Sequence, residues 1–121
     1  MHNFKDLNVW KKARQLVKEV FLITAKFPKE EKFGLTSQIR RSAISIPSNI
    51  AEGCGRKTQK DFCNFLYIAQ GSSFEFETQL MLSLDLGFID NQVFDQHLNQ
   101  LNEIQKMLNG LINSIENKFN K

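Results

Sequence analysis

Nine basic side chains in the first half of the 121-residue sequence have the chemistry of phosphate contacts. Two arginines are adjacent, three basic residues follow an uncharged stretch, and four more lie close together near the start. They are Arg40 and Arg41; Arg56, Lys57 and Lys60; and Lys11, Lys12, Arg14 and Lys18. Because the planar guanidinium of arginine can donate two hydrogen bonds to one phosphate, these residues are candidate contacts to RNA or DNA.

The net charge of +3 hides an uneven distribution of charge along the chain. Residues 1–60 contain 13 Lys and Arg and 5 Asp and Glu, a balance of +8. Residues 61–121 contain 3 and 8 of the same types, a balance of −5. Such asymmetry bears on partners rather than on fold. Since neither a recognition helix nor a row of aromatics for splayed bases is evident, we expect binding without sequence specificity.

The carboxylates give the same arginines a second possible use. Glu52 lies four residues before Arg56, a spacing at which the two side chains can pair on one helix. Arg40 and Arg41 can instead pair with carboxylates of another copy, and the candidates are Glu52, Glu75 and Glu77. Both alternatives stay open: a nucleic-acid surface, or polar contacts between subunits.

Catalytic and metal-binding patterns do not emerge from the sequence. None of the serines lies in a GxSxG-like turn, and neither His2 nor His97 has a convincing nucleophile nearby. Cys54 and Cys63 are nine positions apart and form no CxxC motif, so we expect small buried thiols rather than metal ligands. We therefore expect a protein that is not an enzyme and that uses no cofactor or metal.

Four amphipathic segments must position these residues. Apolar residues recur at helical spacing over about residues 7–26, 36–54, 59–86 and 91–118, and no strand pattern competes. Short connections favour one all-α domain over residues 1–121, an antiparallel up-down-up-down four-helix bundle. The expected helix caps are Asp6 or Asn8, Thr36 or Ser37, Thr58, and Asp90, and the expected stops are Gly53 with Gly55, and Gly87.

Two of these segments carry more apolar surface than one neighbour can cover. In the second, one stripe comprises Ile39, Ala43, Ile46 and Ile50, and a second comprises Ile44, Pro47 and Ala51. Pro47 removes a backbone hydrogen bond, so a kink is expected there. In the third segment, Phe62, Phe65, Phe74 and Phe76 cannot all face one seam. The candidate subunit-interface residues are therefore Ile44, Pro47, Phe65 and Phe74, with Glu52, Glu75 and Glu77.

The second segment also carries a family resemblance. The string FGLTSQIRRSAISIPSNIAEGCGR, with FPKEE before it and GSSFEFETQL after it, resembles the four-helix-bundle proteins encoded by intervening sequences within bacterial 23S ribosomal RNA genes. The resemblance extends from Leu7 to Asp90. That family has no agreed biochemical activity. It is similar to the accessory proteins of diversity-generating retroelements, which form five-subunit barrels and bind nucleic acid and a reverse transcriptase.

The resemblance implies a homopentamer. It makes RNA or DNA, a reverse transcriptase and a ribosomal component candidate partners, and the alternative is a scaffolding protein whose partner is another protein. No apolar run approaches the length of a membrane span, and the first residues lack the apolar core of a signal peptide. We therefore expect a cytoplasmic protein without a membrane partner.

Overall fold

The computed structural model describes residues 3–119, and regular structure in that range is entirely helical. Its four α-helices are α1 (Asn8–Thr24), α2 (Leu35–Cys54), α3 (Gln59–Asp85) and α4 (Asn91–Phe119). Two short 3₁₀ turns, η1 (Phe4–Asp6) and η2 (Lys29–Glu31), precede α1 and α2. The predicted all-α class with four helices is therefore confirmed. His2 lies outside the described residues.

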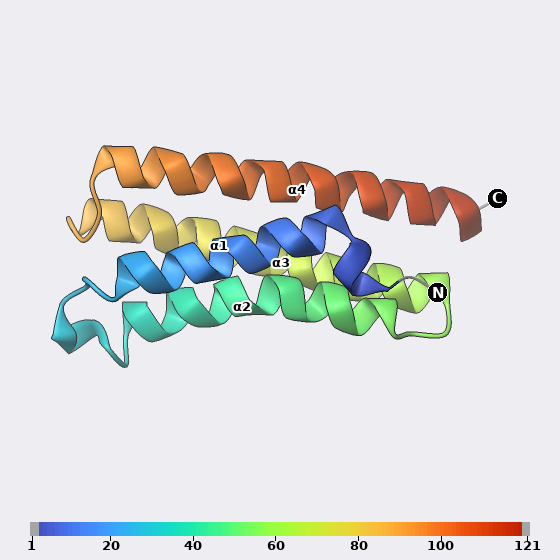
Figure 1. Cartoon of the computed structure of the whole chain (residues 1–121), viewed down its shortest axis with the longest axis horizontal. Coiled ribbons are helices and arrows are strands. Elements are labelled where there is room, and N and C mark those ends of the chain that lie inside the picture. The colour runs from blue at the N-terminus through green and yellow to red at the C-terminus, as the bar shows by residue number, and fades with distance from the viewer. Residues whose placement is uncertain (1–2, 120–121) are drawn as a thin grey trace.

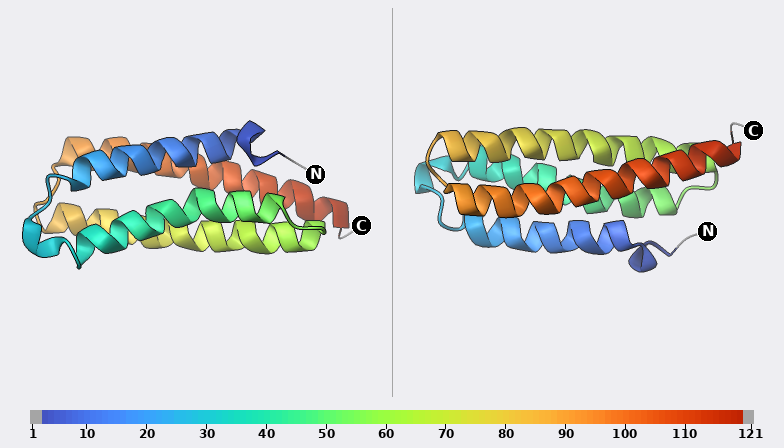
Figure 2. Two further views of the ribbon diagram at one scale, coloured as in Figure 1. Left: turned by 60° about the horizontal axis from the view of Figure 1, so that its bottom comes forward. Right: turned by 90° about the horizontal axis from the view of Figure 1, so that it is seen from above.

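The four helices lie side by side, and the chain turns back at each connection (Figures 1 and 2). α2 packs against both α1 and α3, α3 packs against α4, and α4 returns to α1. Hydrogen bonds join all four neighbouring pairs, through Thr24 and Arg40, Ser42 and Gln79, Glu77 and Gln105, and Glu19 and Gln100. The first two helices therefore share one broad outer face, which carries most of the predicted basic residues.

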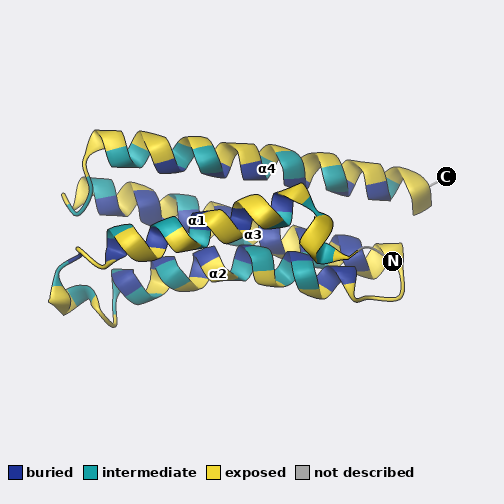
Figure 3. Cartoon of the chain, in the orientation of Figure 1, coloured by how far each residue is buried: buried dark blue, intermediate teal, exposed yellow. Residues whose placement is uncertain are grey.

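The core is a stripe along each helix that faces the centre of the bundle (Figure 3). On α3 every residue of the predicted seam is buried: Phe62, Leu66, Ala69, Ser73, Phe76, Leu80 and Ser83. Residues that recur every three or four positions fall on one side of a helix, so a single neighbour-facing stripe buries them all. The other predicted phenylalanines of α3 are not in this stripe, since Phe65 is half-buried and Phe74 is 55% exposed.

The two apolar stripes predicted for α2 have different fates. Ile39, Ala43, Ile46 and Ile50 are fully buried, whereas Ile44 is exposed and Pro47 and Ala51 are half-buried. α2 continues as one helix across Pro47, and the amide of Asn49 donates to the carbonyl oxygen of Ser45 at 2.8 Å. The predicted bend of the helix axis at Pro47 stays a prediction.

Two of the four predicted helix caps are confirmed. The hydroxyl oxygen of Thr58 accepts from the backbone N–H of Asp61 at 3.1 Å. The carboxylate of Asp90 accepts from the backbone N–H of Val93 at 2.9 Å. Each bond satisfies an N–H group that the first turn of a helix leaves without a partner.

The caps predicted for the first two helices are wrong. α1 starts after Leu7, which makes no side-chain cap bond, because Asn3 and the η1 turn already direct the chain into the helix. α2 starts at Leu35, before Thr36 and Ser37, and its first N–H donates to the carboxylate of Glu31 at 3.1 Å. A carboxylate from the preceding turn thus replaces the predicted hydroxyl cap.

Of the predicted stops, Gly55 and Gly87 are confirmed and Gly53 is wrong; Gly55 is the C-cap residue of α2. Gly87 ends α3 with φ of 76°, a backbone angle that favours glycine. Gly53 lies inside α2, where a β-carbon would come within 2.9 Å of side-chain atoms of Phe62 and Phe65. Glycine is therefore required there for close helix packing. Over residues 3–119, no helix combines the length and apolarity needed to cross a membrane.

Candidate functional site

Three adjoining depressions run along the outer face of α1 and α2, and together we call them the basic groove. The first is lined by Lys11, Arg14, Gln15 and Lys18. The second is lined by Phe4, Trp10, Arg14, Val17, Ile44, Pro47, Ser48 and Ala51. The third is lined by Lys32, Phe33, Thr36, Ser37, Arg40, Arg41 and Ile44. Arg14 and Ile44 join them, and no Asp or Glu is among these lining residues.

The α1 end of the basic groove brings together three of the predicted phosphate contacts. Lys11, Arg14 and Lys18 are exposed, and positions three or four apart share one face of a helix. The guanidinium of Arg14 lies 5.5 Å from the ring centre of Trp10, which is half-buried. None of these three cations has a carboxylate of the described residues within 4.0 Å, the distance limit for an ion pair. They are therefore available to an anionic partner.

The α2 end of the basic groove holds Arg40 and Arg41. The Nε–H of Arg40 donates to the hydroxyl of Thr24 at 2.8 Å, and its guanidinium lies 4.5 Å from the ring centre of Phe21. Arg41 is exposed. Neither arginine forms an ion pair with a carboxylate in the described part of the chain. The alternative, pairing with Glu52, Glu75 or Glu77 of another copy, stays a prediction.

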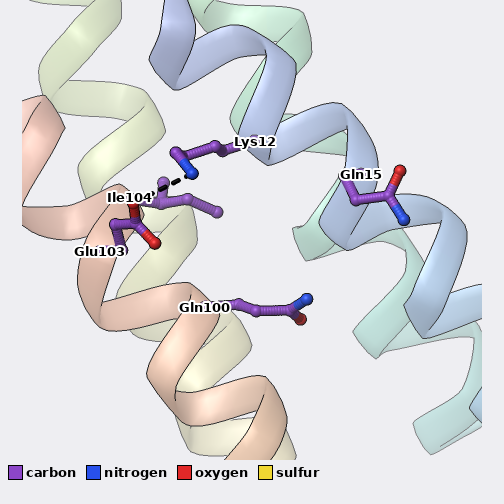
Figure 4. Close-up of a pocket in the computed structure, with 5 residues that line it drawn as sticks. All are labelled: Lys12, Gln15, Gln100, Glu103 and Ile104. Atoms are coloured by element: carbon purple, nitrogen blue, oxygen red, sulfur yellow. Dashed lines mark ion pairs between the residues drawn. The ribbon is translucent and has the colours of Figure 1, made fainter.

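Lys12 lies away from the basic groove. Its ammonium is 3.0 Å from the carboxylate of Glu103, so the pair links α1 to α4 (Figure 4). A separate depression between these helices is lined by Lys12, Gln15, Gln100, Glu103 and Ile104. The amide of Gln100 donates to the carboxylate of Glu19 at 2.5 Å. The predicted grouping of Lys12 with its basic neighbours on α1 thus does not hold, because Lys12 faces α4.

The last three predicted phosphate contacts lie at the connection between α2 and α3. Arg56 pairs with Glu52 at 3.0 Å, which confirms the predicted four-residue spacing. Its guanidinium also lies 4.6 Å from the ring centre of Phe65. Lys57 and Lys60 are exposed. Eight of the nine predicted cations therefore lie in two patches, and Lys12 lies outside both.

The predicted interface residues are spread over different faces. Ile44 and Pro47 line the basic groove, whereas Phe74 and Glu75 are exposed on α3. The exposed apolar side chains of α3 are Tyr67, Ile68, Phe74, Met81 and Leu82, and we call this set the α3 apolar face. Glu77 accepts a hydrogen bond from Gln105 at 3.0 Å and, like Glu52, has a partner in its own chain.

Two features of the structure were not predicted. Phe33 is 87% exposed in the turn before α2. In the sequence, the one indication of this exposure is that Phe33 lies outside every apolar helical stripe. His97 is 3% exposed, with Nδ1 2.8 Å from the carbonyl oxygen of Val93. Its place between Phe94 and Leu101, in the apolar register of α4, is a signal for burial.

The chemical groups of the described residues give no sign of a metal centre. No group of three His, Cys, Asp or Glu side chains in residues 3–119 is placed to hold a metal ion. Cys54 and Cys63 are both buried free thiols, as predicted for small core residues. Burial raises the pKa of both thiols, and the carboxylate of Glu116 raises that of Cys63 further.

Comparison with known proteins agrees with this architecture. No protein with a curated description matches the chain. A solved structure from Bacteroides thetaiotaomicron, a protein of unknown function from the S23 ribosomal protein family, superimposes with a TM-score of 0.80. It is 28% identical in sequence, and the alignment covers 86% of this chain and 97% of that one. The family profile of the 23S rRNA-intervening sequence proteins matches residues 5–110, and the chain therefore belongs to that family.

Proposed function

We propose that the protein is a non-enzymatic, oligomeric protein that binds the phosphate backbone of RNA or DNA without sequence specificity. The observation that carries the proposal is the basic groove. It presents six cations, and its lining contains no carboxylate; the six are Lys11, Arg14, Lys18, Lys32, Arg40 and Arg41. A concave surface of one sign of charge attracts a polyanion and resists other cations.

Binding by these cations should release counterions from the nucleic acid. The logarithm of the association constant then falls linearly with the logarithm of salt concentration, with a slope of about −0.7 to −0.9 per neutralised phosphate. Cations that already pair with a carboxylate should contribute little to the slope, because the carboxylate already neutralises their charge. Lys12 is such a cation, since it pairs with Glu103.

A comparison of two variants on the same helix tests the proposal. The triple variant Lys11→Ala, Arg14→Ala and Lys18→Ala should reduce the slope by about 2 to 3, since three phosphate contacts are lost. The matched control Lys12→Ala should leave it unchanged. The measurement is fluorescence anisotropy with labelled RNA and DNA over a salt series. The proposal fails if the wild-type protein shows no salt-sensitive binding at low ionic strength, or if the triple variant keeps the wild-type slope.

Self-association is the second part of the proposal, and the family resemblance implies five subunits. A head-to-tail contact that pairs the α3 apolar face of one copy with a surface outside the basic groove of the next could close a ring and leave the groove open. The acidic second half of one copy would then meet the basic first half of the next. A bend at Pro47 belongs to the same proposal, because it would direct Ile44 outward while Ile46 stays in the core. Repetition of the basic patches around a ring would strengthen weak single contacts.

A scaffolding role remains the second candidate function, and the α3 apolar face favours it. Apolar side chains grouped on a surface mark protein contacts more often than nucleic-acid contacts. A reverse transcriptase and a ribosomal component are partners that the family resemblance suggests. A cytoplasmic location belongs to the proposal as well, and the two free thiols, Cys54 and Cys63, suit a reducing compartment.

A further inference from the structure

Phe33 is the most exposed of the large apolar side chains in the described range, at 87%. It lies in the turn between η2 and α2, and neither the core nor another helix covers its ring. The turn itself is well fixed. The N–H of Lys32 donates to the carbonyl of Lys29 at 3.2 Å, and the N–H of Gly34 donates to that of Glu31 at 3.0 Å. The ring is thus presented to solvent from an ordered backbone.

The surroundings of Phe33 are basic. The ammonium of Lys32 lies 5.4 Å from its ring centre. The ring lines the third depression of the basic groove, of about 450 Å³, together with Arg40 and Arg41. The acids of the preceding turn are Glu30, which is exposed, and Glu31, whose carboxylate accepts from the N–H of Leu35. An exposed aromatic ring therefore stands at the end of a cationic groove.

We propose that this depression binds single-stranded nucleic acid, with an unpaired base stacked on Phe33 and phosphates on Lys32 and Arg41. The inference rests on the proposed function and specifies the strand type. In a duplex the faces of the bases are covered by their neighbours, whereas a single strand can offer a face to an aromatic ring. Aromatic platforms beside cationic grooves are the general means of binding single strands without sequence preference.

Arg40 supports the same ligand from the other side of the depression. Its guanidinium lies over the ring of Phe21, and its Nε–H donates to the hydroxyl of Thr24. It therefore presents its remaining N–H groups from a fixed plane, the geometry that suits a phosphate. An acidic peptide would satisfy these cations too, but it would leave the face of Phe33 without a planar partner.

Abasic strands separate stacking from backbone binding, because they keep every phosphate and lack the bases. The probes are a labelled oligothymidine, an abasic strand of equal length and a duplex. The wild-type protein should bind oligothymidine about tenfold more tightly than the abasic strand, the scale of one base–aromatic stack. Phe33→Ala should remove this preference, while affinity for the abasic strand and the salt slope stay unchanged. Phe33→Trp should keep the preference.

Phe119→Ala is the matched control, since Phe119 is an exposed phenylalanine at the opposite end of the bundle (Figure 1). It should retain the wild-type preference, and circular dichroism should show equal helix content in all variants. The inference is overturned if Phe33→Ala binds oligothymidine as the wild type does. It is also overturned if the wild type binds the abasic strand or the duplex as tightly as oligothymidine, although the proposed function would then stand.

Two further outcomes decide the case. If the wild type shows no salt-sensitive binding to any strand, both this inference and the proposed function fail. If polyglutamate displaces oligothymidine and itself binds Phe33→Ala more weakly, an acidic protein segment is the ligand and the inference is overturned.

Discussion

The side chain of Arg40 is preorganised for binding, because contacts within the protein already hold its guanidinium in place. A long cationic side chain normally loses rotamer freedom when it binds. Here Thr24 and Phe21 already fix the guanidinium, through a hydrogen bond of 2.8 Å and a ring contact of 4.5 Å. Lysine could not reproduce this arrangement, because its ammonium is a compact point charge without a plane. Arg40 therefore differs from Arg41, which is exposed and has no such support.

Residue chemistry also predicts how stability depends on pH. Burial, and then the charge of Glu116, raise the pKa of the Cys63 thiol above its ordinary value of 9.0. The folded chain therefore keeps this proton at pH values where the unfolded chain has lost it, and stability must fall as pH rises through the folded value. Melting temperature followed by circular dichroism should fall less steeply above pH 9.0 in Cys63→Ala than in the wild type.

Asn64→Ala is the control for this prediction, because it replaces an exposed neighbour that does not titrate. It should melt with the wild-type dependence on pH. Parallel curves for Cys63→Ala and the wild type would show that this thiol does not contribute to alkaline instability.

At the level of elements, the tightest relation is between α2 and α3. Buried and half-buried polar side chains bridge the two helices, through Ser42 and Gln79 at 2.6 Å and through Ser45 and Ser72 at 2.7 Å. Near the connection, the two helices approach so closely at Gly53 that the α-carbon has room for a hydrogen atom but not for a β-carbon. A one-residue slip of α3 would separate both polar pairs, and a buried polar group without a partner costs about 1 to 3 kcal/mol. These contacts therefore fix the register of the two helices.

Glycine substitutions test that close approach. Gly53→Ala should lower the free energy of unfolding by about 1 to 3 kcal/mol, since the added methyl group overpacks against Phe62 and Phe65. Gly110→Ala is the matched control on α4, where nothing lies within 4 Å of the new β-carbon. It should raise the free energy of unfolding by up to about 1 kcal/mol, from helix propensity. Urea denaturation gives both values, and equal effects of the two changes would contradict the packing argument.

Periodicity predicts helices well because it records which side of a helix is buried. Every residue of the α3 seam, from Phe62 to Ser83, follows from spacing alone. Caps and stops depend on the path of the chain outside the helix. Spacing therefore could not show that Glu31 caps α2 or that Gly53 packs inside it.

The candidate site was predictable in part for the same reason. Spacing placed Lys11, Arg14 and Lys18 on one face of a helix. It could not show that Lys12 turns to Glu103, since that depends on where α4 lies. Phe33 follows no helical pattern, and its exposure depends on the absence of any neighbouring element.

As a whole, the molecule has surfaces of different character on different helices. The α1–α2 side carries the basic groove, and α3 carries an apolar face with Glu75 exposed beside it. In a monomer the ring of Phe74 would stay exposed to water, and grouped exposed apolar side chains of this kind mark interaction sites. The α3 apolar face therefore suits a contact between copies that leaves the basic groove open.

The mass in solution tests this arrangement. Light scattering after gel filtration should give several times the protomer mass of 14.0 kDa. Phe74→Glu should lower that mass without loss of helix content, because it places a charge in the α3 apolar face. Leu22→Glu changes an equally exposed apolar residue on α1 and should leave the mass unchanged. A wild-type monomer at micromolar concentration would rule out self-association.

The even number of helices has a practical consequence for how the protein can be handled. α1 begins and α4 ends near the connection between α2 and α3, whereas the turn that carries Phe33 is at the other end (Figure 1). With 27 residues in α3, the two ends are about 40 Å apart along the axis. A dye, affinity tag or surface tether joined to the chain before Asn3 or after Phe119 would therefore leave the Phe33 end unobstructed. Energy transfer from such a dye to a labelled strand would measure where along the axis that strand lies.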